Sequence, residues 1–506
     1  MDKGKRSVKI FIYGLISQVI TLLLGIIIPK LLIVSYGSEV NGLLSSVRQI
    51  FVYVALLEAG IGTASLQALY APMAKGDHQK TSEIMAATDH YYKRTGVLYG
   101  ICVLILALIY PIFINSEIPM PVVAGVIIFQ GASGVINYLF QGKFAILLRV
   151  DGKSYITTNA TTIVNVASKF AQIILILMGC DILVVQGAYF VINLTQMLYI
   201  TWYVKKHYSW LDLKVQPNYS SLSQSKNVII HQISGLIFNN TDILVLTYFC
   251  GLKVVSVYSL YALIINCVSN IIDTICSSVE FILGQAFNSD RQRFLKLQET
   301  YETYYLAVSF AFFTVTLIML PSFIEIYSVG ITDAVYVDKY LPFLFVVLNI
   351  LMYSRRTSSQ IINFAGHFKQ TQLRSIIESI INLSVSLVLV YYIGIYGVLI
   401  GTIAALLYRT NDVIIYANCN ILGRKPWKTY RRWIQNIVVM IVCVWMINYI
   451  LPPMNDYFIW ALNAIWVFLL CFGMYFAVDS LCDRKSFYMI KEIIGNAFLK
   501  RIKKKK

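Results

Sequence analysis

The ten residues "YGSEVNGLLS", from Tyr36 to Ser45, resemble the ten residues "CGLKVVSVYS", from Cys250 to Ser259. The alignment places Gly37 against Gly251, an offset of 214 residues. Further pairs keep nearly the same offset: Tyr91 and Tyr92 match Tyr304 and Tyr305, Gly152 matches Gly366, and Gly187 matches Gly401. Because one offset is maintained over much of the chain, we predict an internal repeat.

The composition places the chain in a membrane. Of its 506 residues, 58% are hydrophobic and only 13% are charged, and the mean hydropathy is +0.68. Soluble globular proteins are far more polar. Apolar runs of about 20 residues, the length that crosses a bilayer as a helix, recur along the whole chain. Strand-like alternation is absent from these runs, so we predict an all-α polytopic membrane protein.

We predict about fourteen transmembrane helices. Their approximate ranges are 9–34, 42–72, 93–114, 121–142, 155–178, 183–204, 227–249, 254–284, 303–327, 341–364, 374–393, 396–417, 434–451 and 457–478. The repeat relates the first six spans to the next six, so both halves keep the same orientation in the membrane. Two six-helix lobes related by an axis along the membrane normal would enclose a central cleft, with the last two spans outside the repeat.

This repeat defines the predicted domains. We expect an N-lobe at 1–204, a cytoplasmic linker at 205–226, a C-lobe at 227–417, two extra spans within 418–478 and a basic cytoplasmic tail at 479–506. The tail ends in "KRIKKKK" and carries apolar residues at helical spacing. This pattern favours an amphipathic helix lying on anionic lipid, with a frayed basic end as the alternative.

Basic residues set the predicted orientation. Loops on one side carry most of the Lys and Arg residues, whereas the opposite short loops hold only Lys253 and Lys339. We therefore expect both termini in the cytoplasm. The net charge of +17 is then mainly a topology signal, and we expect no nucleic-acid partner.

Enzyme motifs are missing from the sequence. There is no Walker loop, HExxH motif, paired-cysteine spacing or nucleophile elbow, and the five histidines and nine cysteines are scattered. We therefore expect a transporter without catalytic residues, a metal site or a cofactor.

Ionisable side chains inside the predicted spans are the candidate functional residues, because such groups normally face a protein interior or an aqueous cavity. Two local ion pairs are expected at helical spacings, Arg374 with Glu378 and Arg409 with Asp412. Three cations nearer the span ends are expected to extend to the interface: Lys30, Lys143 and Arg149.

Four deep cations have no close acid in their own helix: Arg48, Lys169, Arg355 and Arg356. A guanidinium stays charged, and at mid-bilayer it costs from about 2.5 to above 10 kcal/mol, so it must face water, protein or an anionic partner. These cations occur in both halves and, with Arg409, form our predicted site for a phosphate-bearing cargo, which suits the guanidinium fork. A structural ion pair across the bundle is the alternative for Arg355 and Arg356.

The start of the chain resembles a known family. A basic N-terminal segment and a long span precede "YGSEVNGLL", and "LLEAGIGTASLQALYAPMAKGD" then leads into a basic loop. This order is similar to that of the polysaccharide repeat-unit flippases (Wzx type). They belong to the multidrug, oligosaccharidyl-lipid and polysaccharide exporter superfamily, which also includes the lipid II flippases. The resemblance covers the whole chain through order, repeat and span count, and the two C-terminal spans match those of the lipid II flippases.

The resemblance implies a flippase. In this family two six-helix lobes rock about a central cavity and move a lipid-diphosphate-linked oligosaccharide from the cytoplasmic to the outer leaflet. The expected cargo is an undecaprenyl-diphosphate-linked oligosaccharide, with polysaccharide polymerase or glycosyltransferases as protein partners. The expected location is the bacterial cytoplasmic membrane. The alternatives are a multidrug or organic cation exporter of the same fold and a membrane-embedded transferase acting on lipid-linked sugars.

Three acids are candidates for coupling transport to a proton or sodium gradient: Glu58, Asp242 and Asp273. Glu58 in "LLEAGIG" occupies the position that is usually acidic in the family, and Asp273 is its repeat counterpart at an offset of 215. The alternative is that these acids neutralise the cavity arginines and bind no transported ion.

Overall fold

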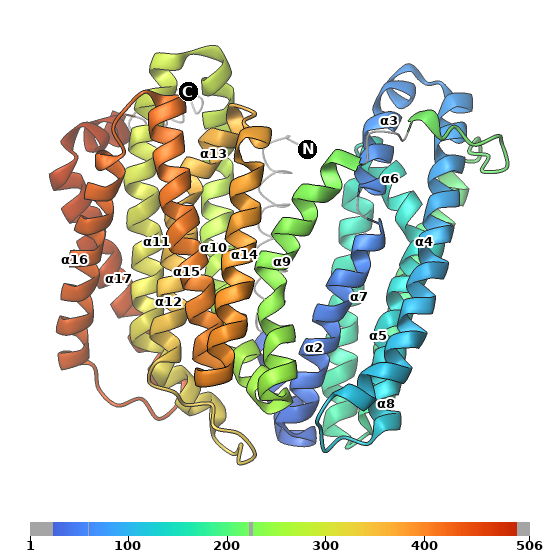
Figure 1. Cartoon of the computed structure of the whole chain (residues 1–506), viewed down its shortest axis with the longest axis horizontal. Coiled ribbons are helices and arrows are strands. Elements are labelled where there is room, and N and C mark those ends of the chain that lie inside the picture. The colour runs from blue at the N-terminus through green and yellow to red at the C-terminus, as the bar shows by residue number, and fades with distance from the viewer. Residues whose placement is uncertain (1–23, 59, 222–225, 493–506) are drawn as a thin grey trace, which may run out of the picture. The chain divides into compact units, whose positions relative to one another are not determined.

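The computed structural model describes residues 24–58, 60–221 and 226–492, and the regular elements in these ranges are helices (Figure 1). The predicted all-α polytopic class is confirmed. Among the described residues, eleven helices are long and apolar enough to cross a membrane. They account for eleven of the predicted spans. Of the other three, 9–34 lies largely outside the described residues, 227–249 forms one helix, and 341–364 is divided into two helices.

The first compact unit comprises residues 1–260 and 331–334. An apolar helix, Leu24–Tyr36, precedes its labelled helices. These are α2 (Ser38–Val54), α3 (Ile61–Lys75), α4 (His78–Phe113), α5 (Met120–Ile136), α6 (Gly142–Val150), α7 (Ser154–Leu177), α8 (Ile182–His207) and α9 (Lys226–Cys250). Asp333 belongs to this unit because its carboxylate accepts hydrogen bonds from the Ser38 backbone nitrogen (2.6 Å) and hydroxyl (2.8 Å). The carboxylate thus stabilises the positive end of α2.

The second compact unit comprises residues 261–330 and 335–506. Helix α10 (Leu252–Ser289) passes from the first unit into the second after Leu260. The remaining helices are α11 (Arg291–Ser328), α12 (Leu341–Ser354), α13 (Arg356–Phe364), α14 (Phe368–Ile393), α15 (Ile395–Tyr416), α16 (Trp427–Ile450) and α17 (Tyr457–Cys482). The predicted lobe boundary at 205–226 stays a prediction.

Repeat-matched glycines share their backbone conformation. Gly37 and Gly251, which directly precede α2 and α10, have φ angles of 88° and 81°. Gly152 and Gly366, which lie in the α6–α7 and α13–α14 connections, both have φ of 68°. Side chains other than hydrogen disfavour this region. The shared conformations support the predicted repeat.

A second shared feature is an interrupted helix. A π-helical segment, Asn137–Gln141, joins α5 to α6. The repeat offset carries Gln141 onto Arg355, the residue at which α12 ends and α13 begins. Both halves therefore depart from regular α-helix at the same place, and such departures often accompany function.

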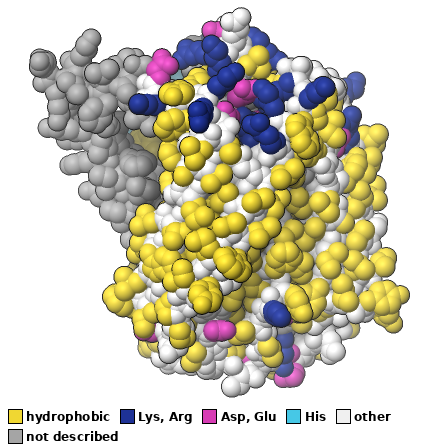
Figure 2. All heavy atoms as spheres, turned by 90° about the vertical axis from the view of Figure 1, so that its left-hand side faces the viewer, with side chains coloured by type: hydrophobic (Ala, Val, Ile, Leu, Met, Phe, Trp, Pro, Cys, Tyr) yellow, Lys and Arg dark blue, Asp and Glu magenta, His cyan; other side chains and the backbone are white. Residues whose placement is uncertain are grey.

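The predicted extra spans, α16 and α17, pack on α11. Arg432 of α16 forms an ion pair with the buried Glu302 of α11 at 2.7 Å. On α17, the Trp460 indole donates to the Met319 carbonyl oxygen at 2.9 Å. Figure 2 shows this side of the molecule, where hydrophobic side chains form a broad band and Lys and Arg side chains gather at one end. This band matches the apolar surface that a bilayer requires.

Candidate functional site

The deep arginines of the second unit form a network with carboxylates. Arg355 pairs with Glu378 of α14, which is buried. Glu378 also lies 3.5 Å from the Nε atom of Arg409 on α15, and Arg409 contacts Asp412 at 2.6 Å. Arg374 completes the network by pairing with Asp412. Among the described residues, three guanidinium groups thus share two carboxylates.

Arg356 belongs to a separate network with α10. It pairs with Asp273 and, at 2.9 Å, with Glu280. The two acids are seven residues apart, so they lie on the same face of α10. One guanidinium facing two carboxylates leaves one excess negative charge.

These contacts correspond to the alternative expected for Arg355 and Arg356, a structural ion pair across the bundle, because each pairs with a carboxylate that another helix supplies. The expected pair of Arg374 with Glu378 is wrong, because Arg374 reaches Asp412 and leaves Glu378 to Arg355. The expected pair of Arg409 with Asp412 is present.

The deep cations of the first unit have different surroundings. Arg48 lies on α2 with an exposed side chain, and it forms no hydrogen bond or ion pair with any described residue. Lys169 lies on α7 and is half-buried. Its Nζ atom is 3.9 Å from the place that a Cβ on Gly25 would take, so it faces the helix Leu24–Tyr36. Arg48 is therefore the deep cation best placed to meet an anionic group from solvent.

The expectation that Lys143 extends to the interface is wrong. Lys143 is 6% exposed and pairs with Asp89 of α4. Asp89 also contacts Lys93 at 2.8 Å. Interior packing of α6 on α4 holds the ammonium group inside the protein, where a carboxylate compensates it.

The three candidate coupling acids lie in different environments. Glu58 ends the 3₁₀ turn after α2 and accepts a hydrogen bond from the Tyr92 hydroxyl at 2.6 Å. Asp242 of α9 is buried and accepts one from the Tyr258 hydroxyl at 2.9 Å. Asp273 instead pairs with Arg356. The repeat positions Glu58 and Asp273 thus differ, because only Asp273 has a guanidinium partner among the described residues.

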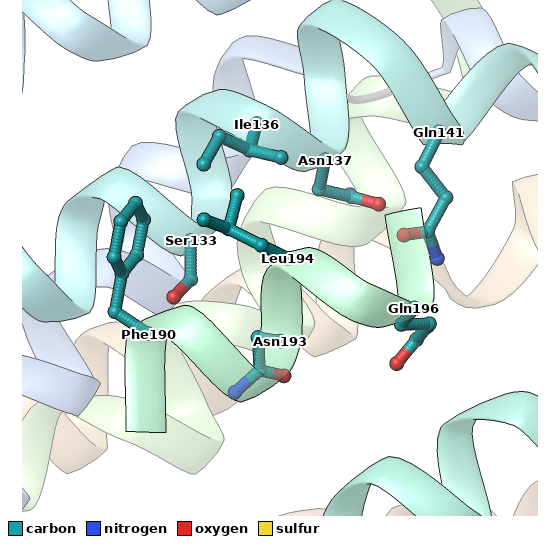
Figure 3. A pocket seen from close by; sticks show the side chains of 8 residues that line it. All are labelled: Ser133, Ile136, Asn137, Gln141, Phe190, Asn193, Leu194 and Gln196. Carbon is teal, nitrogen blue, oxygen red and sulfur yellow. The ribbon is translucent and has the colours of Figure 1, made fainter. Parts of the chain in front are cut away.

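A polar pocket in the first unit was missed by the sequence interpretation. It has a volume of about 180 Å³ and lies between α5, the π-helical segment and α8 (Figure 3). Its lining residues are Ser133, Ile136, Asn137, Gln141, Phe190, Asn193, Leu194 and Gln196. The available signal was four uncharged carboxamides within two apolar spans, which a search for ionisable residues passes over.

No protein-family model matches the chain, and no curated protein sequence matches it. Several solved structures do match this chain. MurJ, a lipid II flippase in an inward closed conformation, matches with a TM-score of 0.73 at 12% identity, over 94% of this chain and 99% of MurJ. The chain has the fold of this flippase.

Two multidrug transporters share the fold less completely. An inward-facing MATE family transporter of the MOP superfamily matches with a TM-score of 0.60 at 15% identity, over 79% of this chain and 95% of that transporter. The MATE transporter DinF-BH in complex with R6G gives 0.56 at 13% identity, over 81% and 94%. The fold expected from the superfamily resemblance is therefore present, and assignment to the Wzx type stays a prediction.

Proposed function

We propose that this protein is a flippase that moves a lipid-diphosphate-linked oligosaccharide from the cytoplasmic to the outer leaflet by alternating access. The observation that carries the proposal is the extent of the likeness to the lipid II flippase, which covers 94% of this chain. The two MATE transporters leave about a fifth of the chain unmatched, at 79% and 81% coverage. That remainder is comparable in length to the segment beyond residue 417.

The charges of the deep residues support an anionic cargo. Arg48 is exposed and without a carboxylate partner among the described residues. Guanidinium groups bind phosphate through paired, charge-assisted hydrogen bonds. In this proposal Arg48 and Lys169, both in the first unit, are the primary diphosphate ligands.

The lipid tail stays in the bilayer during transport. Exposing a polyprenyl chain to water costs about 0.8 kcal/mol for each CH₂ group, so only the polar head can pass through an aqueous cavity. Glycosyltransferases would supply the cargo, and a polymerase would consume it at the outer face.

An organic cation exporter is the second candidate. The Glu58 carboxylate favours it, because Glu58 accepts a hydrogen bond from Tyr92 and has no cationic partner among the described residues. Such a carboxylate could neutralise a cationic solute, and a multidrug transporter of the MATE family has the same fold.

The experiment that separates the candidates is deletion of the gene followed by lipid analysis. The flippase predicts that oligosaccharide-bearing lipid accumulates in the cytoplasmic leaflet and that wild-type protein reverses this. Arg48→Gln should fail to complement at equal abundance. Arg149→Gln, at an exposed arginine of the same unit, should complement fully. Normal lipid distribution together with new sensitivity to ethidium would instead identify the cation exporter.

A further inference from the structure

The polar pocket of the first unit has unused hydrogen-bonding capacity. The side chains of Asn137 and Gln141 form no hydrogen bond with any described residue. The Oγ atom of Ser133 is buried and has no partner among those residues. These three residues are spaced four apart along α5 and the π-helical segment, so they follow one face of the helix.

On the opposite wall, formed by α8, the side-chain amides form hydrogen bonds within the protein through their nitrogen atoms only. Asn193 donates through Nδ2 to the Tyr189 carbonyl oxygen at 2.7 Å, and Gln196 donates through Nε2 to the Thr161 hydroxyl at 3.0 Å. Their carbonyl oxygens, Oδ1 and Oε1, remain available as acceptors. The pocket therefore offers donors and acceptors together.

Such groups need a partner at this depth. The pocket lies within two helices that can span a membrane, Met120–Val150 and Ile182–His207. An amide without a hydrogen bond costs about 1–3 kcal/mol in a protein and more in hydrocarbon, so lipid tails cannot cover these side chains. Water or a polar ligand must occupy the pocket.

The chemistry of the lining selects among polar ligands. None of the eight lining side chains is charged, so the pocket has no specific attraction for a phosphate or an ammonium group. Carboxamides donate and accept, and this matches sugar hydroxyl and N-acetyl groups, which do the same. Figure 3 shows Asn137, Gln141 and Gln196 toward one end of the pocket and Ser133 and Phe190 toward the other. Phe190 thus provides an apolar ring against which the C–H face of a sugar can pack.

We propose that this pocket binds one sugar ring of the transported glycan. The inference rests on the proposed flippase function and adds the group that recognises the carbohydrate. The volume of about 180 Å³ is below the range of about 300–1,000 Å³ typical of pockets for larger ligands. The pocket therefore admits a single neutral hexose or N-acetylhexosamine, and the remaining sugars lie outside it.

The test compares lipids that differ only in their sugar. Binding of undecaprenyl diphosphate, without sugar, is measured beside undecaprenyl-diphosphate-linked N-acetylglucosamine, glucose and galactose, using purified full-length protein in detergent. In wild type, at least one sugar should strengthen binding. Gln141→Met combined with Asn193→Leu should raise the Kd for that lipid about tenfold, as expected from the loss of two hydrogen bonds, and leave the Kd for the sugar-free lipid unchanged.

Two further variants keep the test decisive. Asn159→Leu, at an exposed position of α7 that does not line the pocket, should leave both Kd values unchanged. If the double variant lowers the melting temperature, Asn137→Leu replaces it, because Asn137 is already exposed.

The outcomes separate the pocket from the transport function. If sugar-free and sugar-bearing lipids bind equally to wild type, or if the variant weakens both alike, the pocket assignment is wrong while diphosphate recognition stands. If wild type binds none of the four lipids, the flippase proposal itself fails.

Discussion

Arg355 and Glu378 form a largely buried ion pair that joins the break between α12 and α13 to α14. The Glu378 side chain is 8% exposed and the Arg355 side chain 16%. Helix α12 ends and α13 begins at Arg355, and α14 supplies the compensating charge. The pair thus links the interruption that the two repeats share to the interior charge network of the second unit.

Removing Glu378 alone should destabilise the protein more than removing both members of this pair. Glu378→Gln leaves Arg355, Arg374 and Arg409 with Asp412 as their one carboxylate among the described residues, and breaking a buried pair by removing one partner typically costs about 3–5 kcal/mol. Arg355→Gln with Glu378→Gln removes one of these cations as well. Thermal unfolding in detergent should therefore give a lower melting temperature for Glu378→Gln than for the double variant, and equal melting temperatures would contradict this account.

Arg149→Gln is the matched control for this comparison. Because Arg149 is exposed, this variant should have the melting temperature of wild type. A normal melting temperature for Arg355→Gln, combined with lost binding of undecaprenyl diphosphate, would mean that Arg355 contacts the cargo directly.

Glu58 and Asp273 should respond differently to neutralisation although they occupy equivalent repeat positions. Glu58 bonds to an uncharged tyrosine, so Glu58→Gln should preserve cargo binding and make transport in vesicles insensitive to an imposed pH or sodium gradient. Asp273→Asn still leaves Arg356 a carboxylate partner, Glu280, and should leave the gradient dependence of transport unchanged. If wild-type transport ignores both gradients, coupling is refuted and removal of product sets the direction.

Two repeat-matched glycines offer a test of helix packing. A Cβ at Gly401 would lie 2.2 Å from the Ser386 hydroxyl oxygen and 2.6 Å from its backbone nitrogen, so Gly401→Ala must push α15 away from α14. We expect a loss of about 1–3 kcal/mol in unfolding free energy. At Gly187 the nearest atom would be 3.5 Å away, in the Phe129 ring, and Gly187→Ala should change stability by less than about 0.5 kcal/mol. Equal melting temperatures for the two variants would show that close α14–α15 packing is unimportant.

Features that depend on local pattern could be predicted from the sequence. Apolar length predicts the membrane helices, and a constant offset pairs Gly152 with Gly366, which share a φ of 68°. Helical spacing likewise identified the Arg409 pair with Asp412. These properties are encoded within a few turns of helix or in direct sequence comparison.

Features that depend on packing between helices could not be predicted. Lys143 resembles an interfacial cation in sequence, and only the packing of α6 on α4 brings it to Asp89. Arg356 similarly meets acids that lie more than seventy residues earlier in the chain. The amide pocket could not be predicted for another reason. Asn137 and Gln141 stand out because their side chains form no hydrogen bond with a described residue, and this depends on the fold rather than on the sequence pattern.

The most direct test of the central claim is transport of a lipid-linked oligosaccharide across reconstituted vesicles. Cargo is placed in one leaflet, and its arrival in the other is followed with a membrane-impermeant sugar-binding lectin. Wild-type protein should transfer the cargo far faster than empty vesicles, and Arg149→Gln should match it. Arg48→Gln should slow transfer about 10- to 100-fold, the loss expected for a charge-assisted hydrogen bond. Transfer no faster than in empty vesicles, with cationic dye transported by the same preparation, would contradict the flippase account.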